Sequence, residues 1–120
     1  MEQVVMPPSR RGGEVSNLPT LAVSGELDLA AAPWLHEQLD ALFVGGADSI
    51  VVDLTESTFL DSTALGVLVG ALNRCQERNG QLHLVAARPQ ILRVLRITGL
   101  LEAFTVHASR DELTGEMGAL

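Results

Sequence analysis

The sequence predicts a single α/β domain, built on a mixed, largely parallel sheet of four or five strands with about four helices. Two observations predict it. Short β-branched and aliphatic runs alternate with longer segments whose apolar residues recur at helical spacing, and turn residues separate these segments. An apolar strand, a helix and a second apolar strand in succession indicate parallel strands joined by right-handed crossovers.

The first predicted strand, residues 20–25, enters a turn over residues 25–28. Asp28 is a candidate cap for the helix that follows, because Pro33 then lies in the first turn, where its missing N–H does no harm. Apolar residues at helical spacing extend this helix to about Phe43.

A strand-to-helix turn comes next. Residues 49–54 form the predicted central strand, a loop over 54–59 follows, and a helix runs from about residue 62 to residue 77. Asp61, Ser62 and Thr63 are successive candidates for its N-cap. Ser62 falls in the first turn, where backbone N–H groups lack intrahelical acceptors and negative charge is favoured. The spacing alone leaves two interpretations open, a plain N-cap and a functional site.

The helix over 62–77 has two different faces. The core face is formed by Leu65, Leu68, Val69, Leu72 and Cys75. On the opposite face Gly66 and Gly70 each cost about 1 kcal/mol of helix propensity relative to Ala. Beside these glycines, Ala64, Val67 and Ala71 add apolar area that we do not expect the sheet to cover. A neighbouring helix and a partner protein are equally compatible with this face, which carries Thr63, Gly66, Gly70, Asn73, Arg74 and Glu77.

The C-terminal half is predicted to add two strands and two helices. The strands are residues 81–85 and 104–106. Pro89 and Gly99 bracket one helix, and a capping box over 109–112 opens the other at residue 113. The first of these helices carries the main basic patch, formed by Arg88, Arg93 and Arg96.

The N-terminal segment is the hardest to interpret. Gln3–Met6 has the character of a short edge strand, whereas residues 7–13 have turn and linker chemistry. The predicted domain spans residues 20–115. Residues 1–19 precede it, and residues 116–120 form a C-terminal tail.

The composition indicates one aliphatic core and excludes some functions. The 120 residues are 47% hydrophobic but only 3% aromatic, and the formal net charge of −7 argues against nucleic-acid binding. The single Cys75 lies on an apolar stripe, which indicates a buried thiol and a reducing cytoplasm. No signal peptide is apparent, and no apolar run approaches the ~20 residues of a membrane span. We therefore expect a cytoplasmic protein without membrane insertion.

No pattern in the sequence indicates catalysis. A phosphate-binding loop and a dinucleotide fingerprint are absent, and Ser62 lacks the Gly-x-Ser-x-Gly setting of a nucleophile. His36, His83 and His107 lie on three different predicted elements and show no ligand pairing. We expect a protein that is not an enzyme and that has no cofactor and no metal.

Three stretches carry a resemblance to a known family. Residues 23–28 read Val-Ser-Gly-Glu-Leu-Asp, residues 59–68 contain the Asp-Ser-Thr turn, and residues 97–100 read Ile-Thr-Gly-Leu. In this order they resemble the STAS family (sulfate transporter and anti-sigma factor antagonist), specifically its small bacterial anti-anti-sigma factors. The resemblance covers about residues 20–115.

The resemblance implies a regulatory cycle. The unphosphorylated domain would bind an anti-sigma factor with serine kinase activity and so free a sigma factor for transcription. Phosphorylation of Ser62, or less favourably Thr63, would end this binding, and a serine phosphatase would reset it. Because the carboxyl ends of parallel strands meet at one sheet edge, Glu26 and Asp28 are expected near Ser62. The expected partner surface comprises Glu26, Asp28, Asp61, Ser62, Thr63, Gly66, Val67, Gly70 and Arg74.

Other functions are compatible with the same residues. The domain could be an interaction subunit of another assembly, such as a stressosome-like or lipid-transport complex, with a turn that is never modified. It could be a small-ligand sensor that uses the edge cleft near Gly25 and Ser62. A hydrolase using Ser62 is the third alternative, and a homodimer is compatible with each of them.

Overall fold

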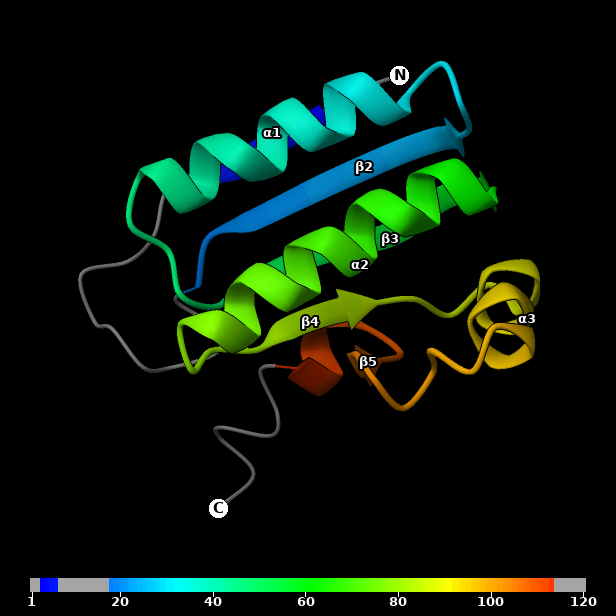
Figure 1. Ribbon diagram of the computed structural model, residues 1–120. Coiled ribbons are helices and arrows are strands. Elements are labelled where there is room, and N and C mark those ends of the chain that lie inside the picture. The colour runs from blue at the N-terminus through cyan, green and yellow to red at the C-terminus, as the bar shows by residue number, and fades with distance from the viewer. Residues whose placement is uncertain (1–2, 7–17, 114–120) are drawn as a thin grey trace.

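The computed structural model describes residues 3–6 and 18–113, which form one five-stranded sheet flanked by helices (Figure 1). The strands lie in the order in which they occur in the sequence. β1 pairs with β2 in antiparallel orientation, and all other neighbours are parallel, so the predicted mixed, largely parallel sheet is confirmed. The strands are β1 (Gln3–Met6), β2 (Thr20–Leu27), β3 (Ile50–Leu60), β4 (Leu82–Val85) and β5 (Thr105–His107).

Helices connect the parallel strands. α1 (Ala32–Val44) joins β2 to β3, and α2 (Ser62–Glu77) joins β3 to β4; both cover the same face of the sheet (Figure 1). α3 (Pro89–Ile97) joins β4 to β5 and packs against β3. A further helical turn begins at Arg110 rather than at the predicted residue 113, because the Ser109 hydroxyl already accepts a hydrogen bond from the Glu112 N–H (3.0 Å).

The main core lies between the sheet and the two helices that cover it, and it is aliphatic as predicted. Leu21, Val52 and Leu84 project into it from three neighbouring strands, and Leu68 projects from α2. Cys75 is also fully buried, and burial raises the pKa of its thiol to about 11. The sulfur is therefore protonated at neutral pH and acts as a small apolar group.

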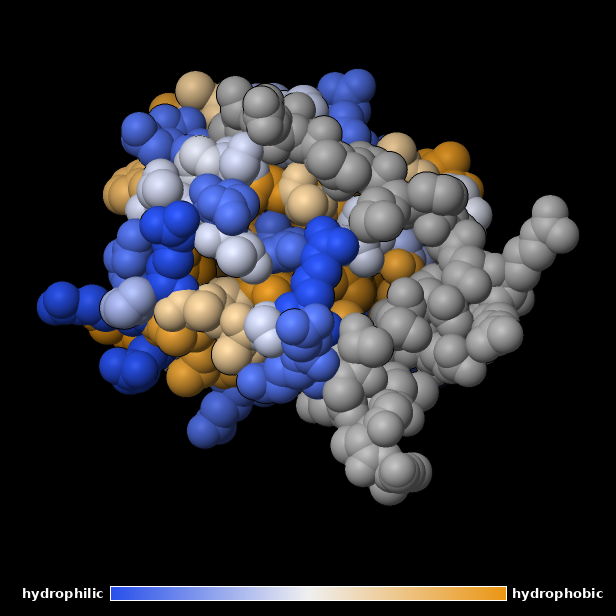
Figure 2. All heavy atoms as spheres, turned by 180° about the vertical axis from the view of Figure 1, so that it is seen from behind, coloured by the Kyte–Doolittle hydropathy of each residue, from blue (hydrophilic) through white to orange (hydrophobic). Residues whose placement is uncertain are grey.

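The second face of the sheet holds a smaller core, formed by Val51, Val85 and Leu113 with Leu18 against it. Hydrophilic side chains lie among hydrophobic ones across this face (Figure 2). Here the structure brings together two histidines that lie on different elements, a contact that the sequence did not indicate. His83 on β4 and His107 on β5 are both buried, and their Nδ1 and Nε2 atoms lie 3.0 Å apart. Neighbouring strands bring together two rings that are 24 residues apart in the sequence.

Two strands run further than the sequence predicts. β2 continues through the predicted turn to Leu27, and β3 continues through the predicted loop to Leu60. Their pairing is irregular in this extension, and Gly25 adopts a φ of 81° beside one register shift, a conformation that glycine tolerates. The Ser57 hydroxyl, fully buried, donates to the Val23 carbonyl oxygen (3.0 Å). This hydrogen bond allows a polar residue inside the paired strands.

Candidate partner-binding site

The N-terminus of α2 displays Ser62. Asp61 has an extended backbone and caps the helix: its Oδ1 accepts a hydrogen bond from the Ala64 N–H (2.9 Å), and its carbonyl accepts from the Leu65 N–H (2.9 Å). Ser62 is thus the first helical residue, and both Ser62 and Thr63 are exposed. Their own N–H groups precede the first intrahelical hydrogen bond, so this end of the helix carries partial positive charge.

The turn after β2 lies at the same edge of the sheet as Ser62. The Asp61 N–H donates to the Leu27 carbonyl (3.0 Å), which ties the start of α2 to the end of β2. Asp28 follows directly, and its Oδ1 accepts from the Ala31 N–H (3.1 Å) in the turn that precedes α1. Glu26 is exposed beside it. A shallow depression of about 370 Å³ at this place is lined by Gly25, Glu26, Asp28, Ala30 and Ala31.

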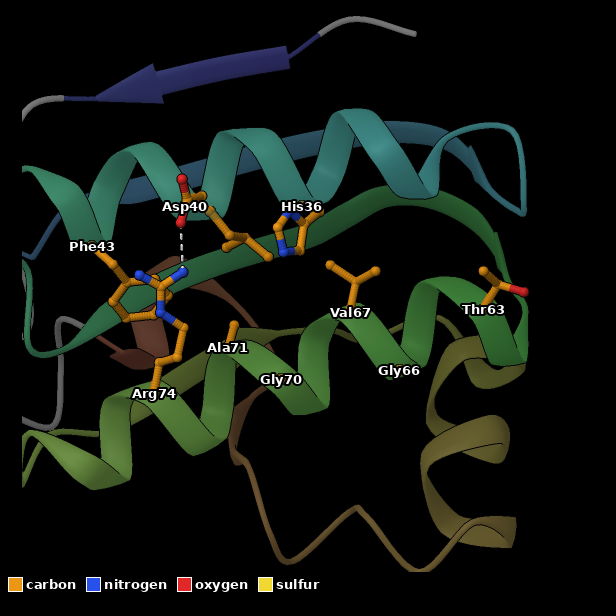
Figure 3. A pocket seen from close by; sticks show the side chains of 10 residues that line it. His36, Asp40, Phe43, Thr63, Gly66, Val67, Gly70, Ala71 and Arg74 are labelled. Carbon is orange, nitrogen blue, oxygen red and sulfur yellow. Dashed lines mark hydrogen bonds and ion pairs between the residues drawn. The ribbon is translucent and has the colours of Figure 1, made fainter.

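A groove of about 340 Å³ runs between α1 and α2 (Figure 3). It extends from Thr63, next to Ser62, along α2 to Arg74. Gly66 and Gly70 line it, and a Cβ built on either would have no neighbouring atom within 4 Å. Val67 is half-buried in the groove. Ala64 and Ala71 are buried, so the expectation that these two alanines add uncovered apolar area is wrong. The fold brings their part of α2 against the core and α1.

Arg74 closes the far end of the groove. Its Nη1 lies 2.7 Å from Asp40 Oδ1 on α1, and its guanidinium lies over the Phe43 ring, 4.4 Å from the centroid (Figure 3). This residue is therefore engaged within the molecule, unlike the exposed Ser62 and Thr63 at the other end. The α1 side of the groove, with His36, Asp40 and Phe43, was not predicted from the sequence, because it depends on how two helices pack together.

The described part of the chain contains neither a metal-binding cluster nor a membrane-spanning helix. Within residues 3–6 and 18–113, no three His, Cys, Asp or Glu side chains are grouped so that they could hold a metal ion. None of the helices described there has the length and apolar character needed to cross a bilayer. The residues around Ser62 thus form an exposed surface with a hydroxyl, three nearby carboxylates and an adjoining apolar groove.

Comparison with known proteins gives a consistent result. A family model described as the STAS domain matches residues 13–113. An anti-sigma-B factor antagonist of Listeria monocytogenes is 34% identical over 93 residues, which cover 78% of this chain and 82% of the relative.

Solved structures with similar folds agree. An anti-sigma factor antagonist from Mycobacterium paratuberculosis superposes with a TM-score of 0.78 at 24% identity, covering 96% of this chain and 93% of that one. The anti-sigma factor antagonist SpoIIAA in its unphosphorylated form gives a TM-score of 0.77 at 18% identity, covering 99% and 98%. The Bacillus SpoIIAA structure in the phosphorylated form gives 0.68 at 18% identity, covering 92% and 95%. Because these structures are less than 25% identical in sequence, their similarity to this chain shows a shared fold and nothing further.

Proposed function

The chain belongs to the STAS domain family, and on this premise we propose that it is an anti-sigma factor antagonist that regulates sigma-factor-dependent transcription. The relative from Listeria monocytogenes, which is named an anti-sigma-B factor antagonist, matches over most of both chains. The activity is one of binding. The surface around Ser62 offers carboxylates and a hydroxyl to a partner, and we assign no catalytic role to any residue.

The proposed switch is phosphorylation of Ser62. The observation that carries it is the exposed position of this hydroxyl at the first residue of α2. In the unphosphorylated state the surface would bind an anti-sigma factor with serine kinase activity, and a serine phosphatase would restore that state. The name of the Bacillus SpoIIAA structure records that a protein of this fold exists in a phosphorylated form. Thr63 is the second candidate acceptor.

A phosphate on Ser62 would change the docking surface more than the fold. It would add about 1.5 to 2 negative charges, and the N–H groups at the start of α2 favour such charge. A docked partner would instead meet this charge beside Asp61, Asp28 and Glu26, on a protein whose net charge is already −7. Repulsion and desolvation at a buried contact cost several kcal/mol, and about 4 kcal/mol corresponds to a thousandfold loss of affinity.

The proposed partner surface continues from Ser62 along the groove between α1 and α2. Gly66 and Gly70 have no contact that explains them within the described chain, since a Cβ at either place would point into open space. A close approach by a partner would explain them. The surface comprises Glu26, Asp28, Asp61, Ser62, Thr63, Gly66, Val67 and Gly70, with Arg74 at its far end.

The proposal is tested by calorimetric titration of the anti-sigma factor of the same organism into wild type and three variants. We expect wild type and Ser62→Ala to bind with similar affinity, and Ser62→Asp to bind at least tenfold more weakly, because a carboxylate places negative charge at the docking point. Gln76→Glu adds the same charge at an exposed residue near the other end of α2, outside the proposed partner surface, and is the matched control; it should bind like wild type. Equal affinity of wild type, Ser62→Ala and Ser62→Asp would contradict the switch.

A second measurement separates the switch from the alternative of an unmodified interaction subunit. The purified anti-sigma factor is incubated with ATP and this protein, and the intact mass is recorded. One added phosphate, absent in Ser62→Ala, is expected. Tight binding without any gain in mass would favour the unmodified subunit.

A further inference from the structure

Four of the six arginines in the described part of the chain have a partner within the molecule. The chain has no lysine, so its eight basic residues are all arginine, and six of them lie within residues 3–6 and 18–113. Arg74 pairs with Asp40, and Arg110 pairs with Asp53. Arg78 donates to the carbonyls of Phe43 and Ala47, and Arg88 donates to the Thr55 carbonyl with Glu56 at 3.7 Å.

Arg93 and Arg96 differ from these four. Both are exposed, and neither has a hydrogen-bond or ion-pair partner among the described residues. They lie on the outer side of α3, because Ile91 and Leu95 bury the opposite side. Residues three and four apart share one face of a helix, so Arg93 and Arg96 lie together with Ile97, whose side chain is 73% exposed.

The stability of the isolated chain does not explain this combination. Cations near the C-terminal end of a helix interact favourably with its dipole, which accounts for an arginine in the last turn. It does not account for a large aliphatic side chain held in water beside two guanidinium groups. One exposed aliphatic side chain is not unusual by itself, but Ile97 shares its helix face with two arginines that have no partner among the described residues, and this combination suits a docking surface.

The patch lies on the same edge of the molecule as Ser62. α3 packs against β3, and Arg88, the N-cap of α3, contacts Thr55 and Glu56 in the part of β3 that extends beyond β4. That strand ends at Leu60, directly before Asp61 and Ser62. Phe59, 46% exposed, is also in this stretch. A partner seated on Ser62 is therefore within reach of α3.

We propose that Arg93, Arg96 and Ile97 form a second docking patch, covered in the complex by an acidic segment of the protein partner that also carries an apolar side chain. The identity of the partner rests on the proposed function. Two arginines are too few for an anionic membrane surface, which is typically recognised by about four to eight basic residues. A chain of net charge −7 is also repelled by such a surface and by nucleic acid.

Charge complementarity at the edge of an interface acts mainly on association and its salt dependence. The patch on α3 would thus steer the partner toward Ser62, whereas the state of Ser62 decides whether the complex persists. Neutralising the two arginines should slow association, and removing the Ile97 side chain should speed dissociation.

The test measures the binding kinetics of the anti-sigma factor to Arg93→Gln/Arg96→Gln and to Ile97→Ser, at low and high salt. The arginine variant should bind about tenfold more weakly at low salt, mainly through slower association, and should show a smaller salt dependence. The control is Gln76→Glu/Gln81→Glu, which changes the net charge by the same two units at two exposed residues, one near the C-terminal end of α2 and one directly before β4. It should bind like wild type.

Each outcome bears on one claim. If the arginine variant binds with the affinity and the salt dependence of wild type, the docking patch is overturned and the proposed function is left intact. Equal weakening by the control would also overturn it, because net charge alone would then explain the loss. Binding of the wild type to phosphatidylglycerol vesicles, lost in the arginine variant, would reassign the patch to a membrane. Failure of the wild type to bind would overturn the proposed function itself and the partner assigned here.

Discussion

At the scale of single residues, Asp61 decides where α2 begins and therefore where Ser62 is displayed. Its side chain accepts a hydrogen bond from the Ala64 N–H, which would otherwise lack a partner, and its carbonyl accepts the first intrahelical hydrogen bond, from the Leu65 N–H. Its own N–H is held by Leu27 of the neighbouring strand. The same residue thus caps the helix and fixes the helix end to the sheet edge.

Replacing Asp61 by Ala should lower the free energy of unfolding by about 1 kcal/mol, the usual cost of losing an N-cap. Asp61→Asn keeps a capping oxygen and should stay close to wild type. Urea denaturation of the three proteins measures the difference. Equal destabilisation by Asn and Ala would mean that the charge, and not the cap, stabilises this end of α2.

Asp53 is a second residue with a measurable consequence. Burial opposes ionisation of this carboxyl, but hydrogen bonds from Thr55 and Arg110 outweigh it and hold its pKa below the ordinary value. A depressed pKa in the folded state means that the carboxylate stabilises the protein above about pH 4. That contribution is lost as the pH falls through the folded-state pKa.

Asp53→Asn should therefore destabilise the protein by about 1–3 kcal/mol at pH 7 and progressively less below pH 4. Urea denaturation at pH 7, 5 and 3 measures the difference from wild type. Asp48→Asn, at an exposed carboxyl, is the control and should change little at any of these values. A difference for Asp53→Asn that stays constant down to pH 3 would contradict the role assigned to its charge.

At the scale of elements, α2 combines a core stripe with a smooth face that borders the groove. Its predicted limits agree with the structure, because strong local signals mark both ends: Asp61 caps the start, and Asn79 in the left-handed region (φ 61°) follows the end. The end of β3 was mispredicted for the opposite reason. Its polar residues are typical of a loop, and only pairing with β2 and the buried Ser57 hydroxyl keep them in the strand.

Replacing the glycines of α2 should have opposite effects on the stability of the free protein and on its affinity for the partner. Gly66→Ala and Gly70→Ala should each stabilise the free protein by up to about 1 kcal/mol, because alanine favours helix and the added methyl meets no atom within 4 Å. Both changes should weaken binding of the anti-sigma factor if it approaches this face closely. Thermal denaturation and calorimetry of each variant measure the two effects, with Gln76→Ala as a control at an exposed position of the same helix. Stabilisation with unchanged affinity would remove this face from the partner surface.

At the scale of the whole molecule, the parallel strand order gathers residues of the proposed partner surface at one edge of the sheet. β2 and β3 end side by side, so the turn with Asp28 and the start of α2 meet there. This proximity could be predicted from the sequence because it depends only on the order of elements. The His83–His107 contact and the α1 side of the groove could not, because strand register and helix packing determine them.

The central claim is that a phosphate on Ser62 converts a form that binds the anti-sigma factor into a form that does not, without changing the fold. The most direct measurement is calorimetric titration of the anti-sigma factor with unphosphorylated protein and with protein phosphorylated on Ser62, together with circular dichroism of both forms. We predict tight binding by the first form, a loss of affinity of at least a hundredfold in the second, and superimposable spectra. Equal affinity of the two forms would contradict the account.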